Sequence, residues 1–385
     1  MAPTILEQNR KDRRGEADGS LRILVYRLGS LGDTLVSLPA FHLVRERFPH
    51  AQITLLTNAP ISDKAPAMAS ILENTGLVDD YVSYPLGMRN PRQAAGLLAA
   101  IRRKGFNLAI HLTAARGLLR SVRDYLFFRL CGIPQVLGVP FAGRDLECRL
   151  ESDGENFEWE PLRLARRVER LGKIDLASDR WWDLRLSEDE QRVAAEHLLK
   201  KNLRARFIVA SIGTKLDVND WTETNWRLLF GELSHFLEDI GLVLVGSADE
   251  YDRSQRCLDA WRGAKANFCG MLSPRVSAAV LGRGCLFIGH DSGPMHLAAA
   301  VGVPCVAIFS ARNLPGQWFP RGQHNTILYR KTPCFGCGLE RCDNYKKACI
   351  LSITVQEVAA AVRGHLLQES VETAHKVIDH RGPIN

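Results

Sequence analysis

The chain has 385 residues, 46% of them hydrophobic and 24% charged, with a formal net charge of +7. This length suits two domains, and this composition is typical of a soluble globular protein. The chain contains no apolar run of about 18 residues, no signal-peptide core, and no concentrated basic block of the kind that binds nucleic acid. We therefore expect a cytoplasmic protein that binds no nucleic acid and whose charge suits an anionic substrate or membrane surface.

The first half alternates short apolar runs with helical patterns, which implies β-α-β units and a parallel sheet. The expected strands are residues 21–26, 52–57, 78–82 and 108–112, and the expected helices are 34–48, 93–104 and 121–130. A polar stretch with a helical pattern at 162–171 follows. We place the connection between the two halves near residues 175–190.

The second half repeats the alternation. Its expected strands are residues 207–212, 242–245, 286–288 and 305–309, and its clearest helix is 226–240. The pattern predicts an α/β protein with two Rossmann-like, doubly wound domains that face a central cleft. The expected parts are an arm at 1–20, domains at 21–180 and 181–365, and a tail at 366–385.

A glycine turn, Gly29-Ser30-Leu31-Gly32-Asp33, follows the first strand. Its glycines let the backbone approach a ligand closely, but their spacing is not the dinucleotide fingerprint G-x-G-x-x-G. Asp33 has two open interpretations. It is either a helix N-cap or a carboxylate that acts as a general base at the cleft.

The segment GHDSGPMH at 289–296 separates an apolar run from a run of small residues. A helix that begins there would direct backbone N–H groups and the Ser292 hydroxyl at an anion, which favours a phosphate site. Asp291, Gly293 and His296 complete this candidate site. His296 alone is equally well explained as a core histidine.

Two further glycine turns follow predicted strands. Lys215 is either a phosphate ligand or a solvated lysine, and Glu250 has the chemistry to accept hydrogen bonds from ribose hydroxyls. The candidate donor residues at these turns are Ser211, Gly213, Thr214, Lys215, Gly246 and Glu250.

Taken in chain order, these motifs resemble glycosyltransferase family 9, the ADP-heptose:lipopolysaccharide heptosyltransferases. The matching segments are RLGSLGDTLVSLP at 27–39, GLLRS at 117–121, LVGSADE at 244–250 and GHDSGPMHLAAAVGVPCVAIF at 289–309. The resemblance implies the GT-B fold, with an acceptor half followed by a nucleotide-sugar half. It also implies inverting transfer that needs no metal for catalysis.

Transferred onto this sequence, the resemblance makes Asp33 the catalytic base and places Asp291, Ser292, Gly293 and His296 on the diphosphate of an ADP-heptose donor. It places Glu250 on the nucleoside. The implied acceptor is an anionic glycolipid, either the lipopolysaccharide core or another surface glycan. The implied location extends to the cytoplasmic face of the inner membrane. Arginine binds carboxylates and phosphates well, so we expect acceptor contacts at Arg89, Arg116 and Arg120. We expect a further acceptor contact at Gly32, in the first glycine turn.

One loop departs from the family pattern. Asn219 or Asp220 stands where a lysine is common, and Thr222 stands where a proline is common. Two alternatives therefore stay open: a heptosyltransferase that modifies proteins, and a non-catalytic nucleotide-sugar-binding protein of the same fold.

Four cysteines lie within sixteen residues of the second half. Such density, with one C-x-x-C spacing, is typical of a structural zinc or iron site, although free thiols in a loop are an equal alternative. The four are Cys334, Cys337, Cys342 and Cys349.

Overall fold

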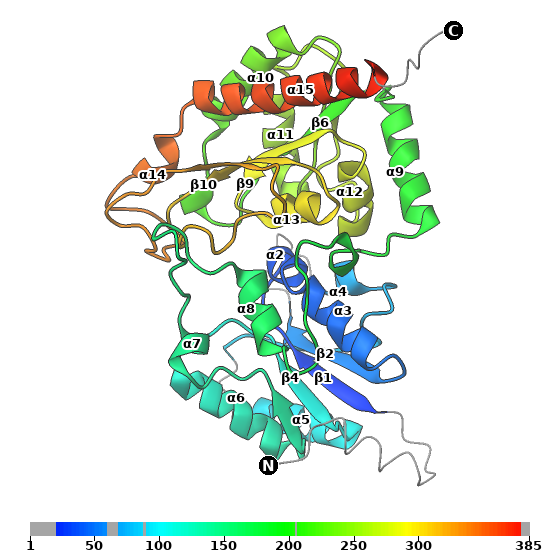
Figure 1. Ribbon diagram of the computed structural model, residues 1–385, viewed down its shortest axis with the longest axis vertical. Coiled ribbons are helices and arrows are strands. Elements are labelled where there is room, and N and C mark those ends of the chain that lie inside the picture. The colour runs from blue at the N-terminus through cyan, green and yellow to red at the C-terminus, as the bar shows by residue number, and fades with distance from the viewer. Residues whose placement is uncertain (1–20, 60–67, 88–89, 205, 379–385) are drawn as a thin grey trace.

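The computed structural model describes residues 21–59, 68–87, 90–204 and 206–378. Two α/β halves lie one above the other along the long axis, and the chain crosses between them near α9 (Figure 1). Each half contains one parallel sheet. The prediction of two Rossmann-like domains is confirmed.

The N-terminal half has the strand order β3-β2-β1-β4-β5. Its strands are β1 (Arg22–Tyr26), β2 (Gln52–Asn58), β3 (Asp80–Tyr84), β4 (Leu108–His111) and β5 (Gln135–Leu137). Its helices are α2 (Leu31–Leu35), α3 (Leu38–Arg47), α4 (Ala69–Leu72), α5 (Pro91–Lys104), α6 (Leu118–Leu130), α7 (Gly143–Leu146) and α8 (Glu160–Arg167). The strand order reverses between β1 and β4, and ligands bind at such a switch point in doubly wound sheets.

The C-terminal half has the strand order β11-β10-β9-β6-β7-β8, so its switch point lies between β6 and β9. The strands are β6 (Phe207–Ser211), β7 (Gly241–Leu244), β8 (Lys265–Asn267), β9 (Leu286–His290), β10 (Cys305–Phe309) and β11 (Thr326–Tyr329). The helices are α9 (Glu188–Lys200), α10 (Glu223–Phe236), α11 (Tyr251–Leu258), α12 (Pro274–Leu281), α13 (Gly293–Ala300), α14 (Ala348–Leu351) and α15 (Val355–Ile378). β6, β9 and β10 are buried along their whole length, which explains their continuous apolar sequences.

One hydrophobic core joins the two halves. It contains one face of each sheet together with α3 and α8 from the first half and α9, α12 and α13 from the second. The buried Arg275 of α12 strengthens the junction, because its guanidinium donates to the carbonyls of Ile71 and Leu184 and pairs with Glu190. This packing holds the ends of the two sheets against each other.

Several elements differ from the expectations. The helix expected at 34–48 is two helices, α2 and α3, because Pro39 lacks an N–H and fits only the first turn of a new helix. The strands β5 and β8 have three residues each, too few to give a sequence pattern. β11 was also missed, and its residues are only half-buried. Helix α15 continues past the expected boundary at 365, whereas the arm at 1–20 lies outside the described residues.

Candidate active site

A cavity of about 590 Å³ lies where the two halves meet. Its walls come from α2 in the first half and from the ends of β6, β7, β9 and β10 in the second. All the residues expected at the donor and at the base line this cavity, together with Gly32: Asp33, Ser211, Gly213, Thr214, Lys215, Gly246, Glu250, Asp291, Ser292, Gly293 and His296. Tertiary structure therefore brings four separate glycine turns to one place.

The N-termini of α2 and α13 approach each other across the cavity. A Cβ atom on Gly32 would lie 3.1 Å from His296 Cδ2, and one on Gly293 would lie 2.7 Å from Leu31 Cδ2. Both glycines thus allow the two halves to touch at the site. Larger residues at either position would push α2 and α13 apart.

Ser30, rather than Asp33, is the N-cap of α2, and Asp33 is the third helical residue, whose side chain completes a capping box. The Asp33 carboxylate still reaches the cavity. Its Oδ2 accepts a hydrogen bond of 3.0 Å from the Ser30 backbone N–H, and its side chain stays 27% exposed. Gly29 has a φ of +136°, and a Cβ there would lie 2.1 Å from the Asp33 carboxyl carbon. The glycine is therefore needed both for the turn and for the position of this carboxylate.

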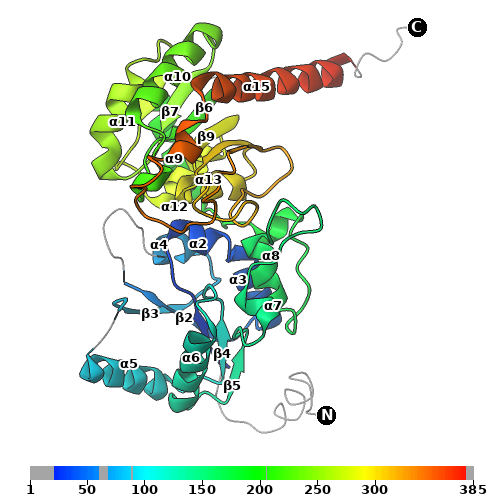
Figure 2. The same cartoon turned by 90° about the vertical axis from the view of Figure 1, so that its left-hand side faces the viewer.

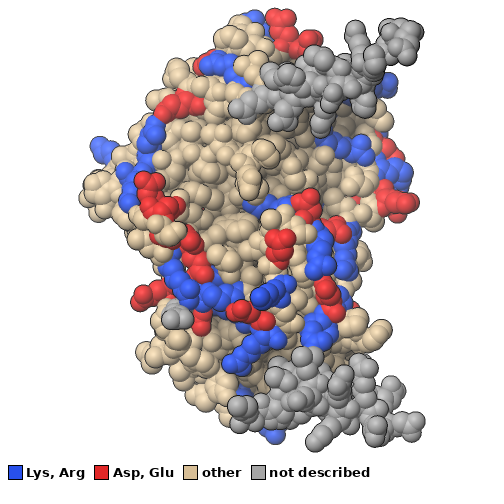
Figure 3. All heavy atoms as spheres, in the orientation of Figure 1, with Lys and Arg blue, Asp and Glu red and all other residues tan. Residues whose placement is uncertain are grey.

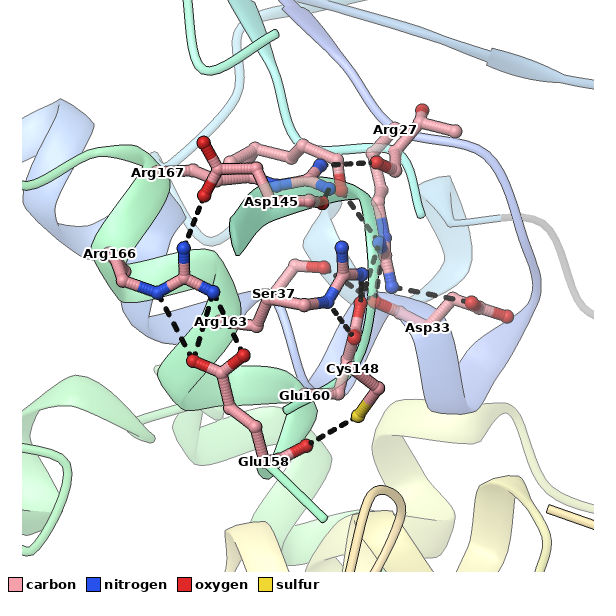
Figure 4. A network of polar contacts seen from close by, with 12 residues as sticks. Arg27, Asp33, Ser37, Asp145, Cys148, Glu158, Glu160, Arg163, Arg166 and Arg167 are labelled. Carbon is pink, nitrogen blue, oxygen red and sulfur yellow. Dashed lines mark hydrogen bonds and ion pairs between the residues drawn. The ribbon is translucent and has the colours of Figure 1, made fainter. Parts of the chain in front are cut away.

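A fully buried arginine, Arg27, holds the carboxylate from behind. Its guanidinium donates to the Leu112 carbonyl at 2.6 Å, to the Asp33 carbonyl at 3.2 Å and to Asp33 Oδ1 at 3.3 Å. It also lies 3.5 Å from the buried carboxylate of Glu160, which Arg163 pairs with at 2.6 Å. Arg27 thus links Asp33 to a network of buried charges (Figure 4).

The network continues to the surface of the N-terminal half. Arg166 pairs with both Glu158 and Asp145, so one guanidinium bridges two carboxylates (Figure 4). Sequence reasoning missed this network. Arg27 belongs to the first glycine motif, and a charged residue directly after a buried strand could have indicated a buried ion pair. Nothing in the sequence near Glu160 indicates that its carboxylate is buried beside Arg27.

The N-terminus of α13 carries the features of an anion site. The first turn of a helix leaves backbone N–H groups without intrahelical acceptors. The Ser292 hydroxyl at the N-cap is buried and has no hydrogen-bond partner among the described residues. An unsatisfied buried hydroxyl is costly, so this group is suited to donate to a ligand.

His296 is buried next to this turn, with its ring 6.1 Å from the Trp318 ring in an edge-on arrangement. Burial lowers the pKa of His296 to about 4. The imidazole is therefore neutral near pH 7 and offers one N–H rather than a positive charge.

Asp291 is held in place by amides. Its Oδ2 accepts 2.9 Å from Asn313, and its carbonyl accepts 3.4 Å from Asn219. Burial raises the pKa of Asp291 to about 6, and the charge of Asp33 acts in the same direction. Asn219, which stands where the family commonly has a lysine, thus supports the loop around Asp291.

The Glu250 carboxylate packs directly against the backbone of two glycines, Gly213 and Gly246. A Cβ on Gly213 would lie 1.9 Å from the Glu250 carboxyl carbon, and one on Gly246 would lie 2.2 Å from its Oε2. The carboxylate also accepts 3.1 Å from the Ser247 backbone N–H. Gly213 and Gly246 therefore make room for an acidic group at the ends of β6 and β7.

Lys215 is exposed at the edge of the cavity, whereas the Thr214 hydroxyl is used within its own turn, where it donates 3.2 Å to the Leu216 carbonyl. Sequence reasoning missed a second cation, Arg312, which lines the cavity directly after β10. Arg312 donates to the carbonyls of Gly338 and Leu339 and so ties the cysteine-rich segment to the site.

The arginines expected at the acceptor do not line this cavity. Arg116 pairs with Asp124 of α6 at 2.8 Å and contacts the hydroxyl of Tyr26, on the face of the sheet that α5 and α6 cover. Arg120 is exposed on α6. Arg89 lies outside the described residues. Acceptor roles for these residues stay predictions.

The expectation of a metal site at the cysteines is not supported by the structure. Among the described residues, no three side chains of His, Cys, Asp or Glu come together as a metal-binding group. Cys349 is buried in the core beside α15, while Cys337 is exposed and Cys334 contacts Thr332. The cysteines therefore differ in environment, from the buried Cys349 to the exposed Cys337.

The fold is that of a GT-B glycosyltransferase: two Rossmann-like halves, with a helix N-terminus facing a carboxylate at the cavity between them. A family model described as glycosyltransferase family 9 (heptosyltransferase) matches residues 97–348. The chain belongs to this family.

Known proteins agree with this membership. A lipopolysaccharide heptosyltransferase 1 from Campylobacter coli is 23% identical over 309 residues, which cover 76% of this chain and 84% of that protein. A solved family 9 glycosyl transferase from Veillonella parvula has a TM-score of 0.64 at 18% identity, covering 92% of this chain and all of that chain. The solved E. coli ADP-heptose lipopolysaccharide heptosyltransferase II has a TM-score of 0.60 at 19% identity, with coverage of 91% and 100%.

Proposed function

We propose that this enzyme transfers a heptose from ADP-heptose to the lipopolysaccharide core, with inversion at the anomeric carbon and without a catalytic metal. The names of its relatives support this donor and acceptor. The observation that carries the proposal is a cavity lined by the Asp33 carboxylate and by the Ser292 hydroxyl, which has no hydrogen-bond partner in the described part of the chain. A base and an anion site across one cavity suit displacement of a nucleoside diphosphate.

In the proposed mechanism, Asp33 takes the proton of the acceptor hydroxyl while its oxygen attacks the anomeric carbon from the face opposite the diphosphate. The bond from that carbon to the diphosphate oxygen breaks, and ADP leaves with its electron pair. The N–H groups of α13 and the Ser292 hydroxyl stabilise the developing charge, and Lys215 adds a positive charge at the edge. Arg27 positions Asp33 but does not touch the reacting atoms.

The remaining contacts have supporting roles in this proposal. Glu250 accepts hydrogen bonds from the ribose hydroxyls of the donor. The acceptor enters past Gly32 from the first half. An anionic glycolipid acceptor would bring the enzyme to a membrane surface. The described helices include none with the length and apolar character needed to cross a bilayer.

A transfer assay with ADP-heptose, a core oligosaccharide acceptor and EDTA tests the proposal. Wild type should form the product, and Asp33→Asn should lower kcat by about 10²–10⁴-fold, since a general base contributes that much. The amide keeps an oxygen for the Ser30 N–H, so the α2 cap survives. Asp189→Asn, on an exposed side chain, is the matched control and should match wild type.

Calorimetric titration with ADP, GDP and UDP separates the alternatives. Tight ADP binding without transfer to any acceptor would favour the non-catalytic reading, which the altered Asn219 loop keeps open. Transfer to a protein but not to the core oligosaccharide would change the acceptor class. Full turnover by Asp33→Asn would show that the base is another group.

A further inference from the structure

Helix α6 turns an apolar stripe away from the protein. Ser121, Asp124 and Phe128 form its buried face. The opposite face carries Leu119, which is 86% exposed, with Leu126 at 52%, Leu130 at 64% and Val122 at 38%. The spacing of these four residues puts them on one side of a helix. A surface helix normally places polar residues there, so this stripe needs a partner.

Positive charge borders the stripe. Exposed Arg123 and Arg129 lie on its two sides, and Arg120 lies further round the helix. The single acid of α6, Asp124, is buried and neutralised by Arg116 and Arg123, at 2.8 and 2.6 Å. The exposed surface of α6 therefore has no negative charge.

The neighbouring helix extends this surface. α5 and α6 pack on the same face of the sheet and lie side by side at the end of the molecule away from the C-terminal half (Figures 1 and 2). The sequence of α5, PRQAAGLLAAIRRK, contains no acid and exposes Arg92, Arg102 and Arg103. In Figure 3 the lower left, where Figure 1 places α6, is mostly free of charged side chains, in contrast to the mixed charges at the waist.

We infer that α6 is a membrane-docking helix that lies in the surface of an anionic bilayer. Its leucines would enter the acyl boundary, and Arg120 and Arg129 would contact lipid phosphates with their charged ends. Charge complementarity selects this partner: two adjacent helices without an exposed acid suit a negative surface. An apolar patch that bound a protein partner would not require the absence of exposed acidic side chains on both helices.

The docking helix is also placed to serve the active site, and this point rests on the proposed function. α6 begins just after β4, at the same edge of the sheet as Asp33. A bilayer that holds α6 would therefore present the sugar end of a membrane glycolipid on the side of the N-terminal half. Transfer to such an acceptor would then take place close to the membrane surface.

Vesicle co-sedimentation of the full chain tests the inference. We expect binding to vesicles of phosphatidylglycerol and phosphatidylcholine, weak binding to phosphatidylcholine alone, and release by salt. Leu119→Glu/Leu126→Glu should weaken binding to the anionic vesicles by at least about a hundredfold, because two leucines that would enter the bilayer are replaced by two repelled charges. Leu228→Glu, on an exposed leucine of the C-terminal half, should bind as wild type does.

A second readout guards against misfolding. The double variant should keep wild-type ADP affinity and wild-type transfer to a water-soluble acceptor. Equal vesicle binding by wild type and the double variant would overturn the inference. So would a wild-type dimer that the double variant converts to a monomer, because α6 would then be an interface between two copies. Vesicle binding does not depend on turnover, so loss of the proposed function would leave this result unchanged.

Discussion

Replacement of Arg27 by Met tests the buried network behind the active site. The Arg27 side chain is fully buried. In the variant, the Leu112 carbonyl loses the donor that lies 2.6 Å away. The Glu160 carboxylate loses one of its two cationic partners and keeps Arg163. Breaking a buried ion pair costs about 3–5 kcal/mol, and the methionine fills much of the space. We expect this loss in the local stability of β1 and β4, which the side chain bridges.

Native-state hydrogen exchange measures that loss directly, element by element. A loss of about 3 kcal/mol or more corresponds to protection factors lower by roughly a hundredfold. Arg180→Met is the control, because Arg180 makes an exposed pair with Glu46 at 3.7 Å, and such pairs contribute about 0–1 kcal/mol. Equal protection in the two variants would refute the buried-network argument. Turnover should fall in Arg27→Met with ADP affinity unchanged, because the donor loops lie in the other half.

Two further predictions concern the donor side. Gly213→Ala should displace the Glu250 carboxylate, since the new Cβ would lie 1.9 Å from its carboxyl carbon, and ADP should bind about tenfold or more weakly by calorimetry. Gly231→Ala in α10 meets no atom within 4 Å and should keep its ADP affinity; equal affinities would remove Glu250 from the site. The pKa of buried His296 is lowered to about 4, so the unfolded chain binds more protons between pH 4 and 6.5 and stability rises with pH there. The free energy of unfolding in urea, measured for wild type and for His296→Gln, should therefore differ by an amount that changes by about 3 kcal/mol across that window. A difference that does not depend on pH would contradict the buried, neutral histidine. Asp291, whose pKa is raised to about 6, acts with the opposite sign but is present in both proteins.

Much of the site was predictable because of how parallel sheets are built. Their strands end at one edge, so residues just after a strand lie near one another even when they are far apart in sequence. Asp33, Gly213, Glu250 and Asp291 each follow a strand, and each lines the cavity. Arg312 follows β10 in the same way and was missed because no glycine marked its turn.

The sequence by itself determined the alternation of strands and helices, the two halves and the glycine turns, because these depend on short-range patterns of burial and backbone freedom. Tertiary structure decided the rest. It paired Arg27 with Glu160, buried Cys349 in the core, and turned the leucines of α6 outward. Each of these outcomes depends on which distant surfaces pack together, and local sequence patterns carry no information about that choice.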